Sequence, residues 1–498
     1  MISNIRTGSD VKIDIVMVVT LSICISLLSI STLLSLSIDD VGTLVHDDPY
    51  KKFQNTFGQW NRYITLVSTN IFGGLNIPVS YYLNLGWIFC VISLSFFLVK
   101  FIKLLAPKQS LFVRFQLCAL AAVFPYMFNV LHFKLIGFSV GFVYLALLGL
   151  VLSWKKPLWV QCLWAAISVT VIAGSYQSGL YWLIITLVGL GVKKSIDGDS
   201  VRDLVVWGVV VSVGLAFGLC IYSGMGALIE STGIVRKHSF ATLPEMQALL
   251  KQRVSPKILR FHVRDMSIFP KWLKLFTILH ISIFVALTLV MLRRRLATWL
   301  AIGLFIFALF LGAIQFLMIP YNYKHVPVRS FWFFGYSYAV IAALYFTACK
   351  ADLRGVVSKW VERVNKAVVT FVVILFAFYT GTFSSGLYQL RNVDKMQAEL
   401  LGQELRSVQF RNGEKVAIYV GSKAKDKIRH QGVTGAVRSL FWVPWSRTQY
   451  LETVTGLKVK DAPREAFKEA SEVCPALNPE RFDKVVVQRA QGYILACL

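Results

Sequence analysis

Long apolar segments alternate with short polar segments through the first four fifths of the chain. A helix that crosses the hydrocarbon core of a bilayer needs about 20 mostly apolar residues. On that criterion the pattern predicts about eleven transmembrane helices, at residues 14–37, 81–102, 111–131, 135–153, 158–175, 179–192, 204–223, 273–292, 297–319, 331–349 and 367–388. The first of these runs is too long for the apolar region of a cleaved signal peptide, so we expect an uncleaved span.

The pattern changes near residue 390, beyond which charged residues occur throughout. Two strand-like runs, KVAIYV from Lys415 and KVVVQ from Lys484, lie on either side of a helix-like segment, PREAFKEASEV, that starts at Pro463. Such a mixture of periods is typical of a small α/β domain. We therefore expect a transmembrane domain over residues 1–390 and a soluble domain over residues 391–498.

Composition places the protein in a membrane. The chain is 56% hydrophobic and only 16% charged, whereas soluble domains are about a quarter charged. The net charge of +26 is also typical of nucleic-acid binding, but most of the excess lies in short loops between apolar runs, where the positive-inside rule puts it. We therefore expect a polytopic α-helical membrane protein with no nucleic-acid partner.

The basic residues also predict an orientation, because they concentrate in alternate connections. Cytoplasmic loops carry the excess of Lys and Arg, so these connections and the N-terminus are predicted to be inside. An odd number of spans then places the C-terminal domain outside, in a compartment that permits a Cys474–Cys497 disulfide. Sequence spacing leaves open whether the two cysteines pair. The basic residues include Lys100, Lys103, Lys108, Lys155, Lys156, Lys193, Lys194, Arg202, Arg293, Arg294, Arg295, Lys350, Arg354, Lys359, Arg363 and Lys366.

Three predicted outer connections, at residues 38–80, 224–272 and 320–330, carry most of the candidate chemistry. The two long ones contain amphipathic stretches, such as LPEMQALLKQRV from Leu243, that predict helices along the membrane surface. The spans themselves are nearly free of Asp and Glu, which argues against a proton-coupled transporter.

Two aspartate pairs follow the first span, Asp39-Asp40 and Asp47-Asp48. Adjacent carboxylates repel each other, so one of them can hold its proton near neutral pH or the pair can engage a cation. The second pair precedes Pro49 and is typical of a helix start in a solvated loop. Asp39 and Asp40 lie at the bilayer boundary, where a carboxylate could meet a lipid-borne substrate, and are our catalytic candidates.

Aromatic and cationic residues of the outer loops are candidates for substrate binding. Trp60 and Tyr63 can stack on a sugar ring, and Arg62 can pair with a phosphate; an interfacial aromatic belt is the alternative interpretation. Cations in the later loops lie on the side that the topology rule disfavours. A lipid phosphate would account for them, and so would attraction to lipid headgroups. The candidates there are Arg264, Tyr323, Lys324, His325 and Arg329.

Several enzyme classes lack their motifs in this sequence. It contains no GxSxG, no HExxH, no Walker loop and no GxGxxG that opens a helix after a strand. It also has no Cys/His spacing typical of a metal site. We therefore expect neither a metal nor a cofactor, and a donor substrate that is not a nucleotide. His132 and His280 are interpreted as structural.

The chain resembles the class C glycosyltransferases, on the strength of Asp39-Asp40 directly after the first span, Trp60 and Arg62 behind them, and a soluble outer tail. It is most similar to the bacterial and phage-borne glucosyltransferases that modify O-antigen and convert serotype. The similarity covers the architecture of the whole chain, but specific residues only over about residues 38–66. Where that family typically has glycine–arginine after the aspartates, this chain has Val41-Gly42-Thr43.

The resemblance implies a reaction of lipopolysaccharide biosynthesis at the periplasmic face of the bacterial inner membrane. The donor would be undecaprenyl-phosphate-linked glucose, and the acceptor a hydroxyl of lipid-linked O-antigen, with inversion and without a metal. Asp40 would be the general base, with Asp39 as its partner. Arg62, Arg264 and Arg329 would stabilise the phosphate leaving group. Membrane lipids, a flippase and a donor-synthesising enzyme would be further partners.

Two other functions remain open on the sequence. An O-antigen polymerase or ligase would share lipid-pyrophosphate substrates, but would depend on arginines rather than on an aspartate pair. A flippase or transporter of lipid-linked sugars would need polar residues through its spans or broken helices. An acyltransferase would need a catalytic histidine within the membrane, for which His280 is the sole, weak candidate.

Overall fold

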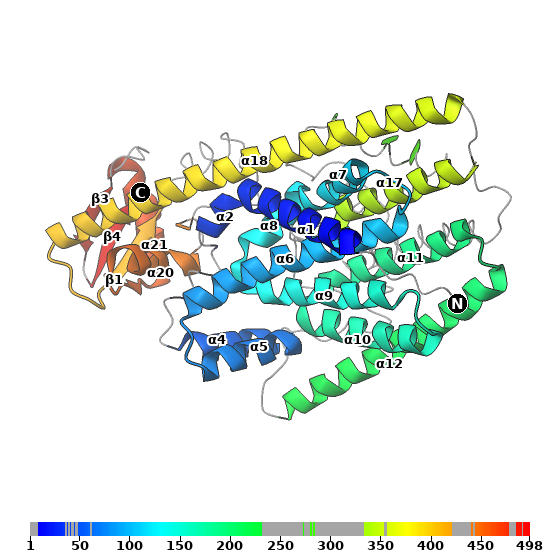
Figure 1. Ribbon diagram of the computed structural model, residues 1–498. Coiled ribbons are helices and arrows are strands. Elements are labelled where there is room, and N and C mark those ends of the chain that lie inside the picture. The colour runs from blue at the N-terminus through cyan, green and yellow to red at the C-terminus, as the bar shows by residue number, and fades with distance from the viewer. Residues whose placement is uncertain are drawn as a thin grey trace, which may run out of the picture.

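A helical bundle with a small sheet at one end makes up the molecule (Figure 1). The computed structural model describes residues 8–34, 37, 40, 44, 48–59, 62–231, 272, 279–280, 282–283, 333–352, 356–420, 440–441, 444–477, 485–490 and 492–498. The predicted outer loop 320–330 and most of the loop 224–272 lie outside these residues.

Within the described residues, 7 helices are long and apolar enough to cross a membrane. Each overlaps a predicted span, including the short one at residues 179–192. The helix α17 (Phe333–Asp352) lies where a further span was predicted. The spans predicted at 273–292 and 297–319 fall almost wholly outside the described residues, so the total of eleven stays a prediction. The helices are α1 (Gly8–Leu28), α6 (Val79–Leu105), α9 (Gly137–Ser153), α10 (Leu158–Ser175), α11 (Leu180–Asp197), α12 (Val201–Glu230) and α18 (Val356–Ser407).

The span predicted at residues 111–131 is wrong as a single helix, because the structure breaks it into α7 (Leu111–Ala122) and α8 (Pro125–His132). Pro125 has no N–H to donate, and its ring disfavours a helical conformation at Phe124. Phe124 accordingly is extended, with φ −64° and ψ 126°. The Val123 carbonyl at the break accepts a hydrogen bond of 2.7 Å from Thr380 Oγ1 of α18.

The first predicted span is also interrupted, since α1 ends at Leu28 and a short α2 (Ile30–Leu34) follows. Beyond it, the loop 38–80, which was predicted to lie outside, contains α4 (Pro49–Gln59) and α5 (Tyr63–Gly74). The helix α4 buries Phe53 and Phe57 against Tyr82 of α6, with ring centroids of Phe53 and Tyr82 5.5 Å apart. Figure 1 shows α2, α4 and α5 at the end of the bundle that carries the C-terminal domain.

Helix α9 packs closely against α6 at its first residue, Gly137. A Cβ added to Gly137, the first residue of α9, would lie 2.5 Å from the carbonyl carbon of Gly86 in α6. Glycine at both positions lets the two backbones approach, as small residues do at interfaces between membrane helices. The residues just before Gly137 are thereby held against α6.

The C-terminal part of the chain, which the sequence predicts to be a separate α/β domain, contains a four-stranded sheet and the helices α20 and α21. Strand order is β2-β1-β4-β3. Strand β1 pairs in parallel with β2 and β4, and β3 pairs antiparallel with β4. Cys474 of α21 and Cys497 of β4 form a disulfide. The elements are β1 (Lys415–Tyr419), α20 (Pro444–Thr455), β2 (Lys460–Asp461), α21 (Arg464–Leu477), β3 (Val486–Ala490) and β4 (Tyr493–Cys497).

The helix α18 joins the bundle to this domain without a break. Its 52 residues extend over about 78 Å at 1.5 Å per residue, more than twice the thickness of a bilayer core. Ala398, Leu401 and Leu405, near its end, pack into the core of the domain with Val416 and Ile418 of β1. The boundary expected near residue 390 therefore falls inside a continuous helix.

Candidate functional site

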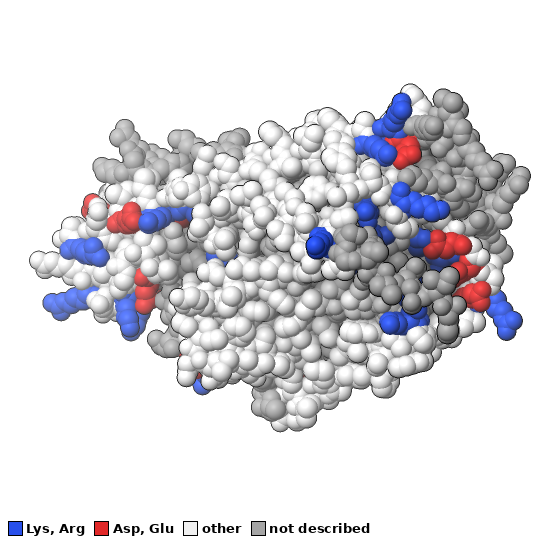
Figure 2. Space-filling model, viewed as in Figure 1, with Lys and Arg blue, Asp and Glu red and all other residues white. Residues whose placement is uncertain are grey.

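Charged side chains on the face shown in Figure 2 gather toward the two ends of the molecule, and the surface between them is nearly free of them. Three of the five basic connections that were predicted to share a side meet, because Lys100, Lys156 and Lys193 line one cavity. The other end carries α2, α4, α5 and the C-terminal domain (Figure 1). The sequence placed its catalytic and binding candidates at that second end.

Asp40 joins the end of the first span to the beginning of α9. Its Oδ1 accepts a 3.0 Å hydrogen bond from the Leu135 N–H, and its Oδ2 accepts one of 2.9 Å from the Ser37 N–H. The Asp40 N–H in turn donates to Ser37 Oγ at 3.2 Å. The side chain is fully buried. Asp40 thus holds two main-chain segments 95 residues apart in sequence.

A second buried charge, Lys134, lies one residue before this contact. Its Nζ donates to the Leu33 carbonyl at 2.5 Å and to Asn84 Oδ1 at 3.2 Å. Burial raises the pKa of Asp40 above its ordinary value, against the opposing effects of the Ser37 and Leu135 hydrogen bonds and of the Lys134 charge. A carboxylate whose pKa is raised is a better proton acceptor at neutral pH.

A third set of buried groups connects the bundle to α18 and the C-terminal domain. Arg391 Nη2 of α18 lies 3.5 Å from His132 Nε2 of α8. Arg391 Nη1 donates to Asp394 Oδ2 at 2.7 Å, and the Leu440 N–H donates to the same oxygen at 3.1 Å. We refer to the five buried side chains as the outer polar cluster: Asp40, Lys134, His132, Arg391 and Asp394.

Of the predicted binding residues, Arg62 and Tyr63 lie at the start of α5, which crosses the same end of the bundle. Arg62 covers the ring of Tyr176 at 5.0 Å, and Tyr63 is buried against Tyr222 of α12. A hydrogen bond anchors α5, since Thr65 Oγ1 lies 2.8 Å from Ser139 Oγ in the first turn of α9. Asp40 contacts Leu135 just before α9, and α5 contacts Ser139 in the first turn of α9, so both contacts lie at the same end of that helix.

This arrangement holds a proton acceptor and cations together in a place of low dielectric. A carboxylate has about four lone-pair sites, so two N–H donors leave capacity for a substrate hydroxyl. Because Asp40 has no exposed surface, such a hydroxyl reaches it only when neighbouring side chains move. Buried ionisable groups in membrane proteins are costly and mark functional sites by default. In the structure Asp40 also holds the segment just before α9, through its hydrogen bond from the Leu135 N–H. That role is purely structural.

The other predicted site residues lie outside the described part of the chain. They are Asp39, Trp60, Arg264, Tyr323, Lys324, His325 and Arg329. Their roles stay predictions, as does the role of Asp40 as a base. The expected absence of a metal also stays a prediction, although no group of three or more His, Cys, Asp or Glu side chains suited to a metal occurs among the described residues.

Sequence reasoning missed Lys134, Arg391 and Asp394. Lys134 had a signal, because it is a cation in the very short predicted outer connection between two spans, where the topology rule disfavours it. His132 was noticed and interpreted as structural. Arg391 and Asp394 lay just past the predicted domain boundary, among exposed charges, and only the continuation of α18 brings Arg391 into contact with His132 of α8.

Comparison with known proteins adds no assignment. Neither a protein-family model, nor a curated protein, nor a solved structure matches this chain.

Proposed function

We propose that the protein is a polyprenyl-phosphate-dependent glycosyltransferase, which moves a sugar from undecaprenyl phosphate onto lipid-linked O-antigen at the outer face of the inner membrane. Asp40 is the general base that takes the proton of the acceptor hydroxyl, and the lipid phosphate leaves the sugar. Cations of the outer end stabilise the charge that develops on the phosphate.

The observation that carries the proposal is the burial of Asp40 beside Lys134 at the beginning of α9. A carboxylate there lies directly after the first span, as the resemblance requires. Its raised pKa suits a base. The helices α4 and α5 follow in the first outer loop, and the Cys474–Cys497 disulfide agrees with an oxidising compartment for the C-terminal domain.

A flippase or transporter of lipid-linked sugars is the second candidate. The interruptions at Ser29 and at Phe124 favour it, because broken helices are a feature of transporter folds. The two functions differ in one respect that can be measured: a transferase makes a glycosidic bond in detergent solution, where there are no compartments to transport between.

The test replaces Asp40 with Asn and follows modification of cell-surface O-antigen at matched amounts of membrane-inserted protein. Asn keeps the size and one oxygen acceptor but removes the base. Loss of a positioned base typically costs about 100-fold to 10,000-fold in rate, so we expect no detectable modification.

Asp48→Asn is the matched control, since Asp48 is exposed in the same loop and caps α4 by accepting the Lys51 N–H at 2.9 Å. Asn caps helices as well as Asp does, so modification should continue. Modification that survives Asp40→Asn, or is lost in Asp48→Asn instead, would overturn the assignment of Asp40. Should Arg391→Lys abolish modification while Asp40→Asn does not, the polymerase or ligase alternative would be favoured.

A further inference from the structure

A basic cavity lies at the opposite end of the bundle from Asp40. It has a volume of about 620 Å³ and is bordered by the N-terminal part of α1, by the C-terminal ends of α6, α9 and α11, and by the connections that follow α6 and α9. Five lysines and two aspartates line it. The lysines outnumber the aspartates, so the cavity attracts anions.

Protein carboxylates balance only part of this charge. Asp14 accepts hydrogen bonds from Lys100 Nζ at 2.6 Å and from Lys103 Nζ at 2.9 Å. Lys193 pairs with Asp197. Lys155 and Lys156, in the connection between α9 and α10, are exposed and form no ion pair with any residue that the structure describes. Their two charges are therefore open to an external anion.

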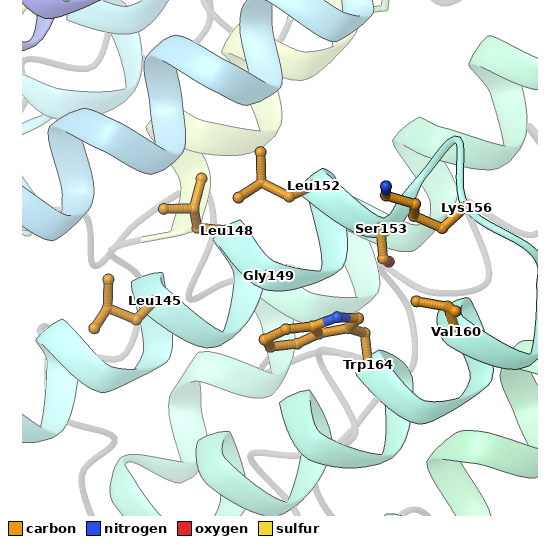
Figure 3. Close-up of a pocket in the computed structure, with 8 residues that line it drawn as sticks. All are labelled: Leu145, Leu148, Gly149, Leu152, Ser153, Lys156, Val160 and Trp164. Atoms are coloured by element: carbon orange, nitrogen blue, oxygen red, sulfur yellow. The ribbon is translucent and has the colours of Figure 1, made fainter.

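An apolar groove between α9 and α10 opens into the cavity. It has a volume of about 340 Å³ and shares Leu152 and Lys156 with the cavity. Figure 3 shows Leu145 at one end of the groove, Lys156 at the other, and the Trp164 indole across the middle. From Leu145 to Leu152 the groove follows α9 for about 10 Å.

Gly149 gives the groove its shape. A Cβ at this position would lie 2.2 Å from the Trp164 ring, so glycine lets the indole lie against the backbone of α9. Leu145 and Leu152 leave 40% and 51% of their surfaces exposed, so the groove is open on the apolar side of the bundle. An acyl chain fits this surface, and a soluble anion makes no use of it.

We propose that the cavity and the groove together bind one anionic phospholipid. Lys155 and Lys156 hold its phosphate, since a lysine ammonium binds phosphate as a point charge. One acyl chain lies along Leu145, Leu152 and Trp164. Basic pockets between membrane helices at the face with excess Lys and Arg take acidic lipid headgroups in this way. The site is separate from the outer polar cluster and does not depend on the proposed transfer reaction.

The test measures phosphatidylglycerol bound to the purified full-length protein by native mass spectrometry. We expect Lys155→Gln/Lys156→Gln to lower the affinity about tenfold or more. Trp164→Ala should also lower the affinity, because it removes the indole against which the acyl chain packs. Phosphatidylcholine, which has no net charge, should bind far more weakly, and glycerol 3-phosphate, which has no acyl chain, should not compete.

Lys108→Gln/Arg202→Gln is the matched control, because it removes the same charge from the same end without altering either lining. It should leave the affinity within about twofold. If this control loses as much affinity, the lipid is held by general attraction to positive charge, and the proposed site is overturned. Unchanged affinity in Lys155→Gln/Lys156→Gln would overturn it too, and competition by glycerol 3-phosphate would identify a soluble anion as the occupant. Thermal unfolding in a neutral detergent checks that each variant is folded.

Discussion

At the scale of single residues, the outer polar cluster combines the carboxyl groups of Asp40 and Asp394 with the basic side chains of Lys134 and Arg391, all of them buried. Removing one partner of a buried ion pair leaves an uncompensated charge, which costs more than the pair contributed. The cluster therefore predicts strong and non-additive effects of substitution. Separating its structural role from a catalytic one requires measurements on folded protein.

The first prediction at this scale concerns pH. Burial raises the pKa of Asp40 above its ordinary value of 3.8, and a base must be ionised to accept a proton. The rate of sugar transfer should therefore fall as pH decreases through this raised pKa. Hydrogen bonds from the backbone N–H and from the side chain of Ser37 both lower the pKa of Asp40. Ser37→Ala keeps the first and removes the second, so it should raise the pKa and move the fall in rate to higher pH. A pH profile that stays in place or moves to lower pH contradicts this role.

A second prediction concerns the junction between α18 and α8. Arg391→Met leaves the Asp394 carboxylate buried without its cation, and should lower the free energy of unfolding by about 3–5 kcal/mol. Adding Asp394→Asn removes that charge but keeps an oxygen for the Leu440 N–H. The double variant should therefore be more stable than Arg391→Met alone, as measured by thermal or denaturant unfolding in detergent. Purely additive losses would mean that the two side chains are not coupled.

At the scale of elements, apolar windows predicted the helices well, because burial in lipid demands long apolar runs whatever the packing. The same windows could not show interruptions, since Ser29 and Phe124 are themselves compatible with a span. Pro125 was a visible signal for the second break. The break is also stabilised by Thr380, distant in sequence, whose hydroxyl donates a hydrogen bond to the Val123 carbonyl. The helix α20 and the strand β4 were not predicted, because short segments acquire their form from the sheet around them.

The element prediction concerns the contact between α6 and α9. Gly137→Ala would place a methyl group 2.5 Å from the Gly86 backbone. Because the close atom belongs to the backbone, this clash is relieved only if α6 and α9 move apart. That change should displace Leu135 and its bond to Asp40, lowering both stability and activity. The control is Gly208→Ala in α12, where a Cβ meets nothing within 4 Å; it should be neutral or stabilise by about 0.5–1 kcal/mol. Equal behaviour of the two variants in thermal unfolding would refute this packing argument.

At the scale of the whole molecule, two features bear on the predicted orientation, which stays a prediction. Three of the basic connections meet at one end, and the disulfide lies at the other. The predicted candidate site could be located only in part, because Asp40 and Arg62 are described but most of its partners are not. The contacts that hold Asp40 and α5 near the beginning of α9 join segments about 70 to 100 residues apart, which no local pattern reveals.

The orientation gives a prediction of its own. Alkaline phosphatase fused after Leu498 of the full chain should be active, and a green fluorescent protein at the same place should stay dark. The Cys474–Cys497 pair should resist alkylation in intact cells until a reductant is added. A fluorescent fusion together with freely alkylated cysteines would place the C-terminal domain inside, and with it the Asp40 end of the bundle.

The central claim is that the carboxylate of Asp40 takes a proton during sugar transfer. The most direct test gives purified protein in detergent an undecaprenyl-phosphate sugar and a lipid-linked glycan acceptor, and measures the glycosidic bond formed per folded molecule. We expect transfer by the unchanged protein and by Asp48→Asn, and a loss of at least about 100-fold per folded molecule in Asp40→Asn, although losing the buried charge beside Lys134 also lowers its unfolding temperature. Transfer by Asp40→Asn at the unchanged rate, or no transfer by the unchanged protein, would contradict the account.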